Sequence, residues 1–342
     1  MVITYRMRSS DLKIVESING KSWKRSSVKF LMAVEVAKLF KSYKSLSLIK
    51  DEKDSRFLKG GFSGRKPVGS RINFLPNGEK LNKAYSLFAE GLHVHDESSN
   101  SHWDVIFMNP NGSYSYLYTL DKINLSNKAK YKRIKEFSKV FPKLKANLNK
   151  AIGKEDIVLA MLILLKTKMR VGNEIYYLKS RHKGLTTLKK KNIKISGKKV
   201  KFRYIGKGGV PMEKEDLFSD SFISAFKKLL AKKKANDFIF VNSKGHPMKD
   251  VAFESAFLKY CGKKFYPHIV RSEYATRKTK EFLNGRKKIN KEEIKEFYLK
   301  IAHNLGHKKF SKKKGEWEDS YVVTLHHYVS PDLAMRVEKA SV

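Results

Sequence analysis

Basic side chains outnumber acidic ones by more than two to one, and this imbalance limits what the chain can fold into. Its 342 residues include 73 lysines and arginines against 33 aspartates and glutamates, which gives a formal net charge of +40. A hydrophobic fraction of 41%, with 12% aromatic residues, is too high for a disordered basic tail and sufficient for a core. A folded body with this charge calls for a polyanion, so the composition predicts a nucleic-acid-binding protein.

The positive charge is distributed along the chain rather than collected in a tail. Short lysine-rich runs recur at 189–191, 232–234, 286–288 and 312–314. One such run is typical of a solvated surface, but their recurrence favours a long basic surface that follows a phosphate backbone. The candidate DNA contacts are Lys189, Lys190, Lys191 and Arg277.

Several classes of protein are excluded by what the sequence lacks. Cys261 is the single cysteine, which excludes an intramolecular disulfide and a zinc site built from several cysteines. There is no His-Glu-x-x-His pattern and no phosphate-binding loop ending in Gly-Lys-Ser/Thr, so we expect no metal and no nucleotide cofactor. The longest apolar run, 157–165, is too short to span a bilayer. Without an apolar signal region at the N-terminus, we expect a protein of the cytoplasm or nucleoid, or of a virion if the source is viral.

The hydrophobic patterns predict an α+β fold with a β-containing N-terminal domain, 1–122, and a mainly helical domain, 123–342. In the first domain an amphipathic helix is expected at 27–42, followed by a Gly-, Pro- and Ser-rich stretch of loops and short strands. Segments at 103–108 and 113–119, separated by Asn-Pro-Asn-Gly, predict a β-hairpin.

From about residue 126 the periodicity becomes helical. A helix is predicted at 128–140, and Pro142 should end it. The segment 155–168 is apolar almost all round, which predicts a buried helix. A small antiparallel sheet is expected from the strand-like segments 185–188, 193–195 and 200–205. The remaining helices are expected at 221–234, 250–261, 270–283 and 291–305.

Arginines carry the most chemical information in a lysine-rich chain. Phosphoryl transfer without a metal needs cations around the phosphorus, and a planar guanidinium can hold two phosphate oxygens where an ammonium cannot. Arg170 directly follows the predicted buried helix, in the sequence Arg-Val-Gly-Asn-Glu. Taken alone, it is more typical of a helix C-terminal cap than of a reactive site. The motifs that follow it change this interpretation.

Six short motifs stand in a definite order in the second half of the chain. They are RVGNE at 170–174, GLTTL at 184–188, YIGKGGV at 204–210, HIVR at 268–271, LGH at 305–307 and YVSP at 328–331. This order resembles the type IB DNA topoisomerases, in particular the compact bacterial and poxvirus-like forms, whose catalytic domain is shared with the tyrosine recombinases. The resemblance begins near residue 100 and runs to the C-terminus. No single motif is specific, but their number and order are.

The resemblance implies catalytic roles for five residues. Arg170 and Arg271 match the family's two catalytic arginines. His307 matches the histidine that, with the second arginine, contacts the scissile phosphate, and Lys207 matches the lysine at the tip of a β-hairpin. Tyr328 matches the nucleophile, which attacks the phosphorus to give a 3′-phosphotyrosyl link and a free 5′-hydroxyl. In the family the lysine, assisted by the first arginine, protonates that leaving oxygen.

Each of these residues also has a simpler interpretation. A lysine in a Gly-rich hairpin is usually just exposed, and His307 is equally typical of a helix C-terminal cap. Arg271 is a reasonable partner for a salt bridge, and Tyr328 is one of 16 tyrosines. The order of the motifs favours the catalytic interpretation in every case.

Two features depart from the family's pattern. In many members the histidine precedes the tyrosine by nine residues, whereas His307 and Tyr328 are 21 apart. An inserted loop is expected at 308–319, and Tyr321 becomes a rival nucleophile; we prefer Tyr328 because a proline follows it three residues later. His268 begins a His-x-x-Arg motif, which is typical of recombinases, while topoisomerases more often have lysine there. It is a candidate phosphate ligand, with a packing role after the preceding proline as the alternative.

The resemblance implies a type IB DNA topoisomerase that closes as a clamp round duplex DNA, nicks one strand, lets the duplex swivel and reseals the nick without metal or ATP. We expect it to act as a monomer. The alternatives are a tyrosine site-specific recombinase, which needs paired sites and a tetrameric synapse, and a non-enzymatic basic DNA-binding protein whose binding collapses with salt.

Overall fold

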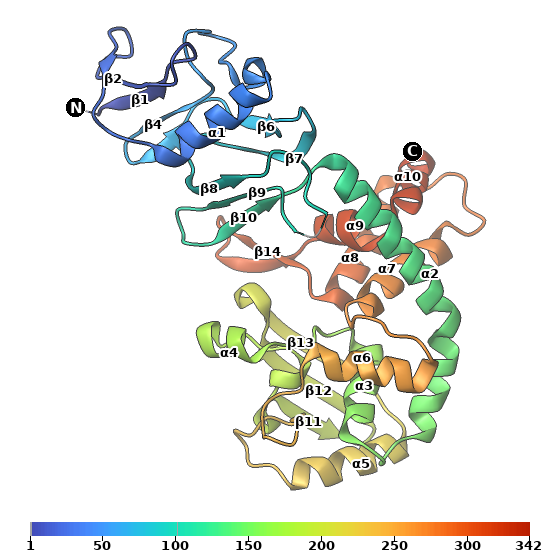
Figure 1. Cartoon of the computed structure of the whole chain (residues 1–342). Coiled ribbons are helices and arrows are strands. Elements are labelled where there is room, and N and C mark those ends of the chain that lie inside the picture. Colours follow the sequence, from blue (N-terminus) through green and yellow to red (C-terminus); the bar gives the residue numbers. More distant parts are fainter. Residues whose placement is uncertain (1, 101) are drawn as a thin grey trace. The chain divides into compact units, whose positions relative to one another are not determined.

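The computed structural model describes residues 2–100 and 102–342, and the chain divides into two compact units. Unit 1 extends to Lys130, and unit 2 comprises Tyr131–Val342. The division falls inside α2 (Leu120–Lys150), the same helix that contains the boundary predicted at 122/123. Strands dominate unit 1 and helices dominate unit 2, so the fold is α+β as the sequence predicts (Figure 1).

The described residues of unit 1 form three small antiparallel sheets, the helix α1 (Leu31–Ser42), a short 3₁₀ helix (Leu46–Ile49) and the first turns of α2. The largest sheet has the strand order β3-β2-β1-β4-β5, with β1 (Thr4–Met7), β2 (Ile14–Ser17), β3 (Lys24–Arg25), β4 (Gly61–Ser63) and β5 (Lys66–Val68). The other two contain β6 (Ile72–Phe74) with β7 (Lys80–Tyr85), and β10 (Tyr114–Leu117) with β9 (Val105–Met108) and β8 (Glu90–Val94). The helix α1 and the β9–β10 hairpin confirm two of the predicted elements.

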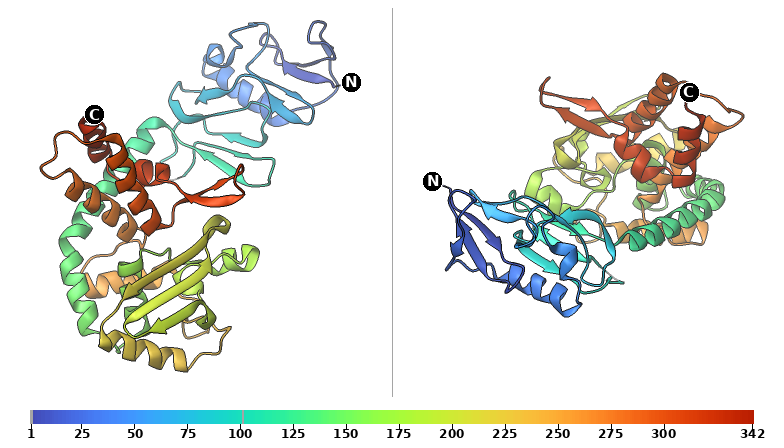
Figure 2. Two further views of the ribbon diagram at one scale, coloured as in Figure 1. Left: turned by 180° about the vertical axis from the view of Figure 1, so that it is seen from behind. Right: turned by 90° about the horizontal axis from the view of Figure 1, so that it is seen from above.

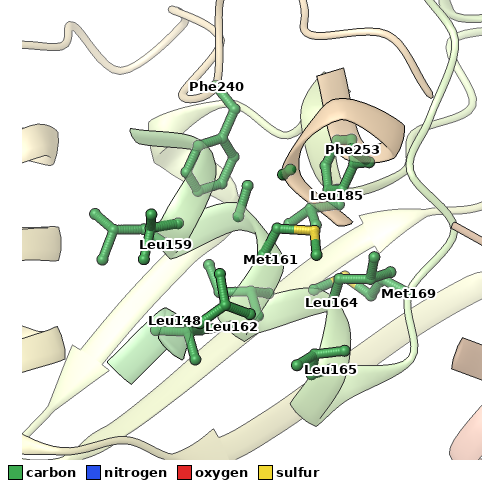
Figure 3. Close-up of a cluster of buried hydrophobic side chains, with 14 of the residues drawn as sticks. Leu148, Leu159, Met161, Leu162, Leu164, Leu165, Met169, Leu185, Phe240 and Phe253 are labelled. Carbon is green, nitrogen blue, oxygen red and sulfur yellow. The ribbon is translucent and has the colours of Figure 1, made fainter. Parts of the chain in front are cut away.

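Unit 2 is organised around the helix α3 (Asp156–Thr167). Nine of its residues are buried, which confirms the predicted buried helix. Figure 3 shows its leucines and Met161 surrounded by side chains from other segments, among them Leu148, Phe240 and Phe253. A three-stranded antiparallel sheet packs against this helix, with the order β11 (Ile193–Ser196), β12 (Lys199–Ile205) and β13 (Pro211–Leu217). Its other helices include α4 (Glu174–Ser180), α5 (Asp220–Ala231) and α6 (Asp250–Cys261).

Four helices at the C-terminal end of unit 2 form a second core. They are α7 (Ile269–Leu283), α8 (Lys291–Leu305), α9 (Val322–Tyr328) and α10 (Pro331–Ala340). The helices α7 to α10 pack on one another, and their dark orange and red ribbons lie together in Figures 1 and 2. Tyr298 and Tyr328 are buried in this core. Tyr328, the tyrosine of the YVSP motif, is therefore packed against other side chains.

The predicted helix end at Pro142 is wrong, because α2 continues through this proline to Lys150. An internal proline costs a helix about 3 kcal/mol through a lost hydrogen bond and a steric clash. Beyond it, however, Leu144 and Leu148 are fully buried against the α3 core. Burying two leucines contributes about 3–6 kcal/mol, which matches or exceeds that cost.

Two further segments differ from their predictions. The segment 185–188 was expected to be a strand, but Leu185–Thr187 is a short 3₁₀ helix. Its backbone pairs with the turn after α3 instead of a sheet, since the Leu185 amide donates to the Arg170 carbonyl at 2.8 Å and the Thr186 amide to the Val171 carbonyl at 2.7 Å. The expected loop at 308–319 is a hairpin of β14 (Lys308–Ser311) and β15 (Glu316–Asp319), whose register sets lysines opposite carboxylates.

Gly184 allows the Arg170 segment to approach the 3₁₀ turn. A methyl group at Gly184 would lie 2.6 Å from the carbonyl oxygen of Arg170 and 2.6 Å from the amide nitrogen of Gly172. Because backbone atoms cannot rotate away, we expect Gly184→Ala to lower the free energy of unfolding by about 2 kcal/mol or more, measured by urea denaturation. Gly197→Ala is the control, since that turn position has open space and only a positive φ to oppose a side chain. An equal loss in both variants would contradict the close approach.

Candidate active site

The hydroxyl of Tyr328 lies among basic side chains contributed by separate segments of unit 2. Arg170 Nη2 donates to Tyr328 Oη at 3.2 Å, and His268 Nε2 lies 3.0 Å from the same oxygen. The His307 ring is 4.6 Å from the Tyr328 ring, and the Arg271 guanidinium carbon is 5.4 Å from it, measured to ring centres. These five residues, which come from four separate segments of the chain, therefore gather around the side chain of Tyr328.

Arg170 is placed by the abrupt end of α3. Lys168 takes a left-handed conformation, with φ of 55°, and ends the helix. The chain beyond it is fixed by the backbone bonds to the 3₁₀ turn described above, and Asn173 then caps α4 by accepting from the Tyr176 amide. Arg170 is thus an exposed side chain on a rigid backbone segment.

Arg271 is held from three directions in the first turn of α7. One terminal nitrogen donates to the carbonyl oxygen of Lys168 at 2.5 Å, and the other to that of Leu305 at 2.8 Å. The second nitrogen also lies 3.0 Å from His307 Nε2. The side chain is only 3% exposed, and burial lowers the pKa of its guanidinium, although an arginine remains charged at physiological pH.

His307 follows the glycine that ends α8. Gly306 has φ of 69°, the left-handed conformation common after a helix, and it directs the next residue into the site. Burial, and then the nearby charges of Arg271 and Arg170, lower the pKa of the His307 imidazole to about 3. The His307 ring is therefore neutral in the protein without bound DNA.

Lys207 occupies the turn between β12 and β13, the hairpin tip predicted for it. It is exposed and lines a cavity of about 490 Å³ together with Arg170, Arg271 and His307. An oxyanion in this cavity would have two guanidiniums, an ammonium and an imidazole around it. Such a site can stabilise negative charge on a bound phosphate.

Sequence reasoning missed Lys214, a half-buried lysine on β13 that lines the same cavity. Its Nζ donates to the carbonyl oxygens of His303 and Asn304, at 2.8 and 2.7 Å, in the last turn of α8. Burial, helped by the charge of Arg271, lowers its pKa to about 7. The alternating pattern of β13 could have revealed this residue. Side chains two positions apart on a strand share a face, so Lys214 lies on the same half-buried face as Met212.

The 308–319 insertion does not separate His307 from the tyrosine helix. The Ser320 amide donates to the His307 carbonyl at 2.9 Å, which closes the base of the β14–β15 hairpin. Because the chain returns to its starting point, α9 begins beside His307 despite the longer spacing. Lys308 and Lys309, at this base, add two lysines to the cavity wall.

The rival tyrosine, Tyr321, lies in a different environment. It precedes α9 and its ring stacks on that of Tyr298, 6.2 Å away, within the C-terminal core. Among the described residues no hydrogen bond joins it to Arg170, Arg271 or His307. The geometry therefore favours Tyr328 as the reactive tyrosine.

The four candidate DNA contacts lie outside this cluster. Lys189 rests on the ring of Phe238, Lys190 donates to the carbonyl of Lys233 at 2.9 Å, and Lys191 is exposed. Arg277 pairs with Glu273 and Glu281 on its own helix, at 3.0 and 2.8 Å. Their contact with DNA stays a prediction.

Two other findings concern the described residues. No three histidine, cysteine or carboxylate side chains come together as a metal site. None of the helices there has the length and apolar character needed to cross a membrane.

Comparisons with known proteins point to one family. Residues 121–322, more than half of the chain, match the family described as eukaryotic DNA topoisomerase I, catalytic core; Tyr328 lies just beyond the matched range. The DNA topoisomerase 1B of Acanthamoeba polyphaga mimivirus is 28% identical over 137 residues, which are 38% of this chain and 40% of that protein. The chain thus matches less than half the length of this relative.

Solved structures of a recombinase are similar at a lower level. The XerH site-specific recombinase bound to difH substrate, a pre-cleavage complex, is 17% identical, with a TM-score of 0.34 over 52% of this chain and 50% of that one. Its post-cleavage complex with palindromic difH is 18% identical, with a TM-score of 0.34 over 50% and 48%. A TM-score at this level does not establish a shared fold.

Proposed function

The chain belongs to the family of the eukaryotic DNA topoisomerase I catalytic core, and from this premise we propose that it is a type IB DNA topoisomerase acting on duplex DNA. The observation that carries the proposal is the Tyr328 hydroxyl, which lies within hydrogen-bonding distance of Arg170 and His268. Since Tyr328 lies outside the matched range, its role rests on this geometry and on the sequence motif.

In the proposed cleavage step, Tyr328 Oη attacks the phosphorus and the bond from phosphorus to the 5′ oxygen breaks. A phenol becomes a good nucleophile only when its proton leaves, and His268 Nε2, at 3.0 Å, is placed to accept it. Lys207 gives a proton to the departing 5′ oxygen. Religation reverses these transfers, and the phosphotyrosyl link conserves the bond energy, so no ATP is needed.

The two arginines stabilise the charge that spreads over the non-bridging oxygens in the transition state. Arg271 is preorganised by two backbone carbonyls, so little reorganisation is needed when the phosphate arrives. Arg170 contacts the Tyr328 hydroxyl and also lines the cavity, where a non-bridging oxygen of the phosphate would lie. Between cleavage and religation the duplex would swivel about its intact strand. Action as a monomer, closure of the chain as a clamp round DNA and a cytoplasmic or nucleoid location remain part of this proposal.

The proposal predicts relaxation of a supercoiled plasmid in EDTA without ATP. We expect complete relaxation of both positive and negative supercoils at about one enzyme per ten plasmids, because each molecule turns over and needs no metal. Topoisomer distributions on agarose gels measure this. Activity only at stoichiometric amounts, or only on plasmids with paired specific sites, would instead indicate a recombinase. DNA binding that leaves no protein attached after denaturation would indicate a non-enzymatic protein.

A further inference from the structure

The hydroxyl of Thr324 contacts the ring nitrogen of His307 that faces away from Arg271. Thr324 lies on α9, one helical turn before Tyr328, and is fully buried. Its Oγ1 is 2.7 Å from His307 Nδ1, while His307 Nε2 is 3.0 Å from Arg271 Nη2. Both ring nitrogens of this histidine are thus occupied.

These contacts fix which nitrogen carries the proton. A guanidinium only donates hydrogen bonds, so His307 Nε2 must accept from Arg271. The proton of the neutral ring therefore resides on Nδ1 and is donated to Thr324 Oγ1. The charged groups whose field reaches this ring most strongly are Arg271, Arg170 and Lys214. The two guanidiniums have no acceptor atom, and Lys214 Nζ is bonded to the carbonyls at the end of α8.

Binding of a phosphate requires the opposite arrangement. To donate to a phosphate oxygen, the role expected of His307, Nε2 must carry the proton. In the neutral ring Nδ1 then becomes an acceptor. A hydroxyl can reverse its role, because it donates and accepts equally well. A valine of the same shape can do neither.

We propose that Thr324 is a positioning residue that supports both tautomers of His307, one in the free protein and the other with phosphate bound. This inference rests on the proposed function. Because Thr324 and Tyr328 are separated by four residues on one helix, the same contact keeps the imidazole in register with the nucleophile.

The test compares Thr324→Val with Thr324→Ser in single-turnover cleavage of a duplex, measured as covalent adduct at saturating protein. We expect the valine variant to form adduct about 10–100-fold more slowly, because the buried Nδ1 of His307 is left without a hydrogen-bond partner. The serine variant should stay within about threefold of the wild type. Thr279→Val, another fully buried threonine whose hydroxyl bonds the Ala275 carbonyl on α7, should cleave normally.

A spectroscopic readout separates this role from simple packing. In ¹⁵N spectra of histidine-labelled protein, the His307 proton should be on Nδ1 in the free protein. It should move to Nε2 in the complex of Tyr328→Phe with duplex DNA. A proton on Nδ1 in both states, a valine variant as fast as wild type, or equal slowing by valine and serine would each overturn the inference. Wild-type protein that forms no adduct would overturn the proposed function itself.

Discussion

Replacing Tyr328 with phenylalanine is expected to abolish covalent attachment to DNA while leaving duplex binding intact. The variant lacks only the oxygen that lies 3.2 Å from Arg170 Nη2 and 3.0 Å from His268 Nε2, and the ring remains to fill its place in the C-terminal core. Without a nucleophile no phosphotyrosyl bond can form, so adduct formation should fall by at least about 10⁴-fold. Denaturing gels of end-labelled duplex measure the adduct, and fluorescence anisotropy measures binding.

Tyr321→Phe is the matched control for this experiment. The two tyrosines lie within the same short segment, and both rings pack in the C-terminal core, but only Tyr328 contacts the basic cluster. The Tyr321 variant should therefore retain adduct formation within about threefold of the wild type. If the Tyr328 variant relaxes plasmid normally while the Tyr321 variant is inactive, the nucleophile is misassigned.

Helix boundaries could be predicted where the sequence itself contains the cap. The helix predicted at 291–305 is found at those residues, because Asn290 caps its start by accepting from the Glu292 amide and Gly306 ends it in the left-handed conformation. In the same way, Gly262 ends the helix predicted at 250–261. These signals are local, so no knowledge of the tertiary structure is needed to use them.

Predictions failed where distant packing decided the outcome. The continuation of α2 beyond Pro142 depends on two leucines that meet the α3 core, and the sequence around the proline does not reveal this contact. The 185–188 segment has the composition of a strand, yet its amides bond to the backbone after α3. In both cases a tertiary contact outweighs the local preference.

The site shows the same division between local and distant information. The motif series predicted which side chains meet, and the structure brings Arg170, Arg271, His307 and Tyr328 together. Lys214 and Thr324 carry no motif, and their importance depends on contacts across 89 and 17 residues of sequence. Groups that orient a reactive side chain are chosen by the final packing, so a sequence pattern seldom reveals them.

Replacing Arg170 with alanine is expected to slow cleavage by about 10²–10³-fold while weakening duplex binding less than about tenfold. The guanidinium contacts the attacking oxygen, so its charge acts mainly on the transition state, as donors aimed at developing negative charge do. In the ground state it is one cation among many on a chain of net charge +40, and losing it removes one phosphate contact at most. Single-turnover cleavage at saturating protein, with anisotropy titrations at fixed salt, separates the two effects.

Arg336→Ala provides the matched control, because this arginine is exposed on α10 and does not line the cavity shared by Arg170 and Arg271. It removes the same charge from the same unit, so any general electrostatic loss should appear in both variants. We expect its cleavage rate to stay within about twofold of the wild type. An alanine substitution is less informative at Arg271, because the buried carbonyls of Lys168 and Leu305 would lose their hydrogen-bond donor. Arg271→Lys is the better variant there, since it keeps the charge but loses the planar guanidinium. Equal losses of binding and cleavage in the Arg170 variant would make this residue a backbone anchor, and catalysis would then depend on the buried arginine alone.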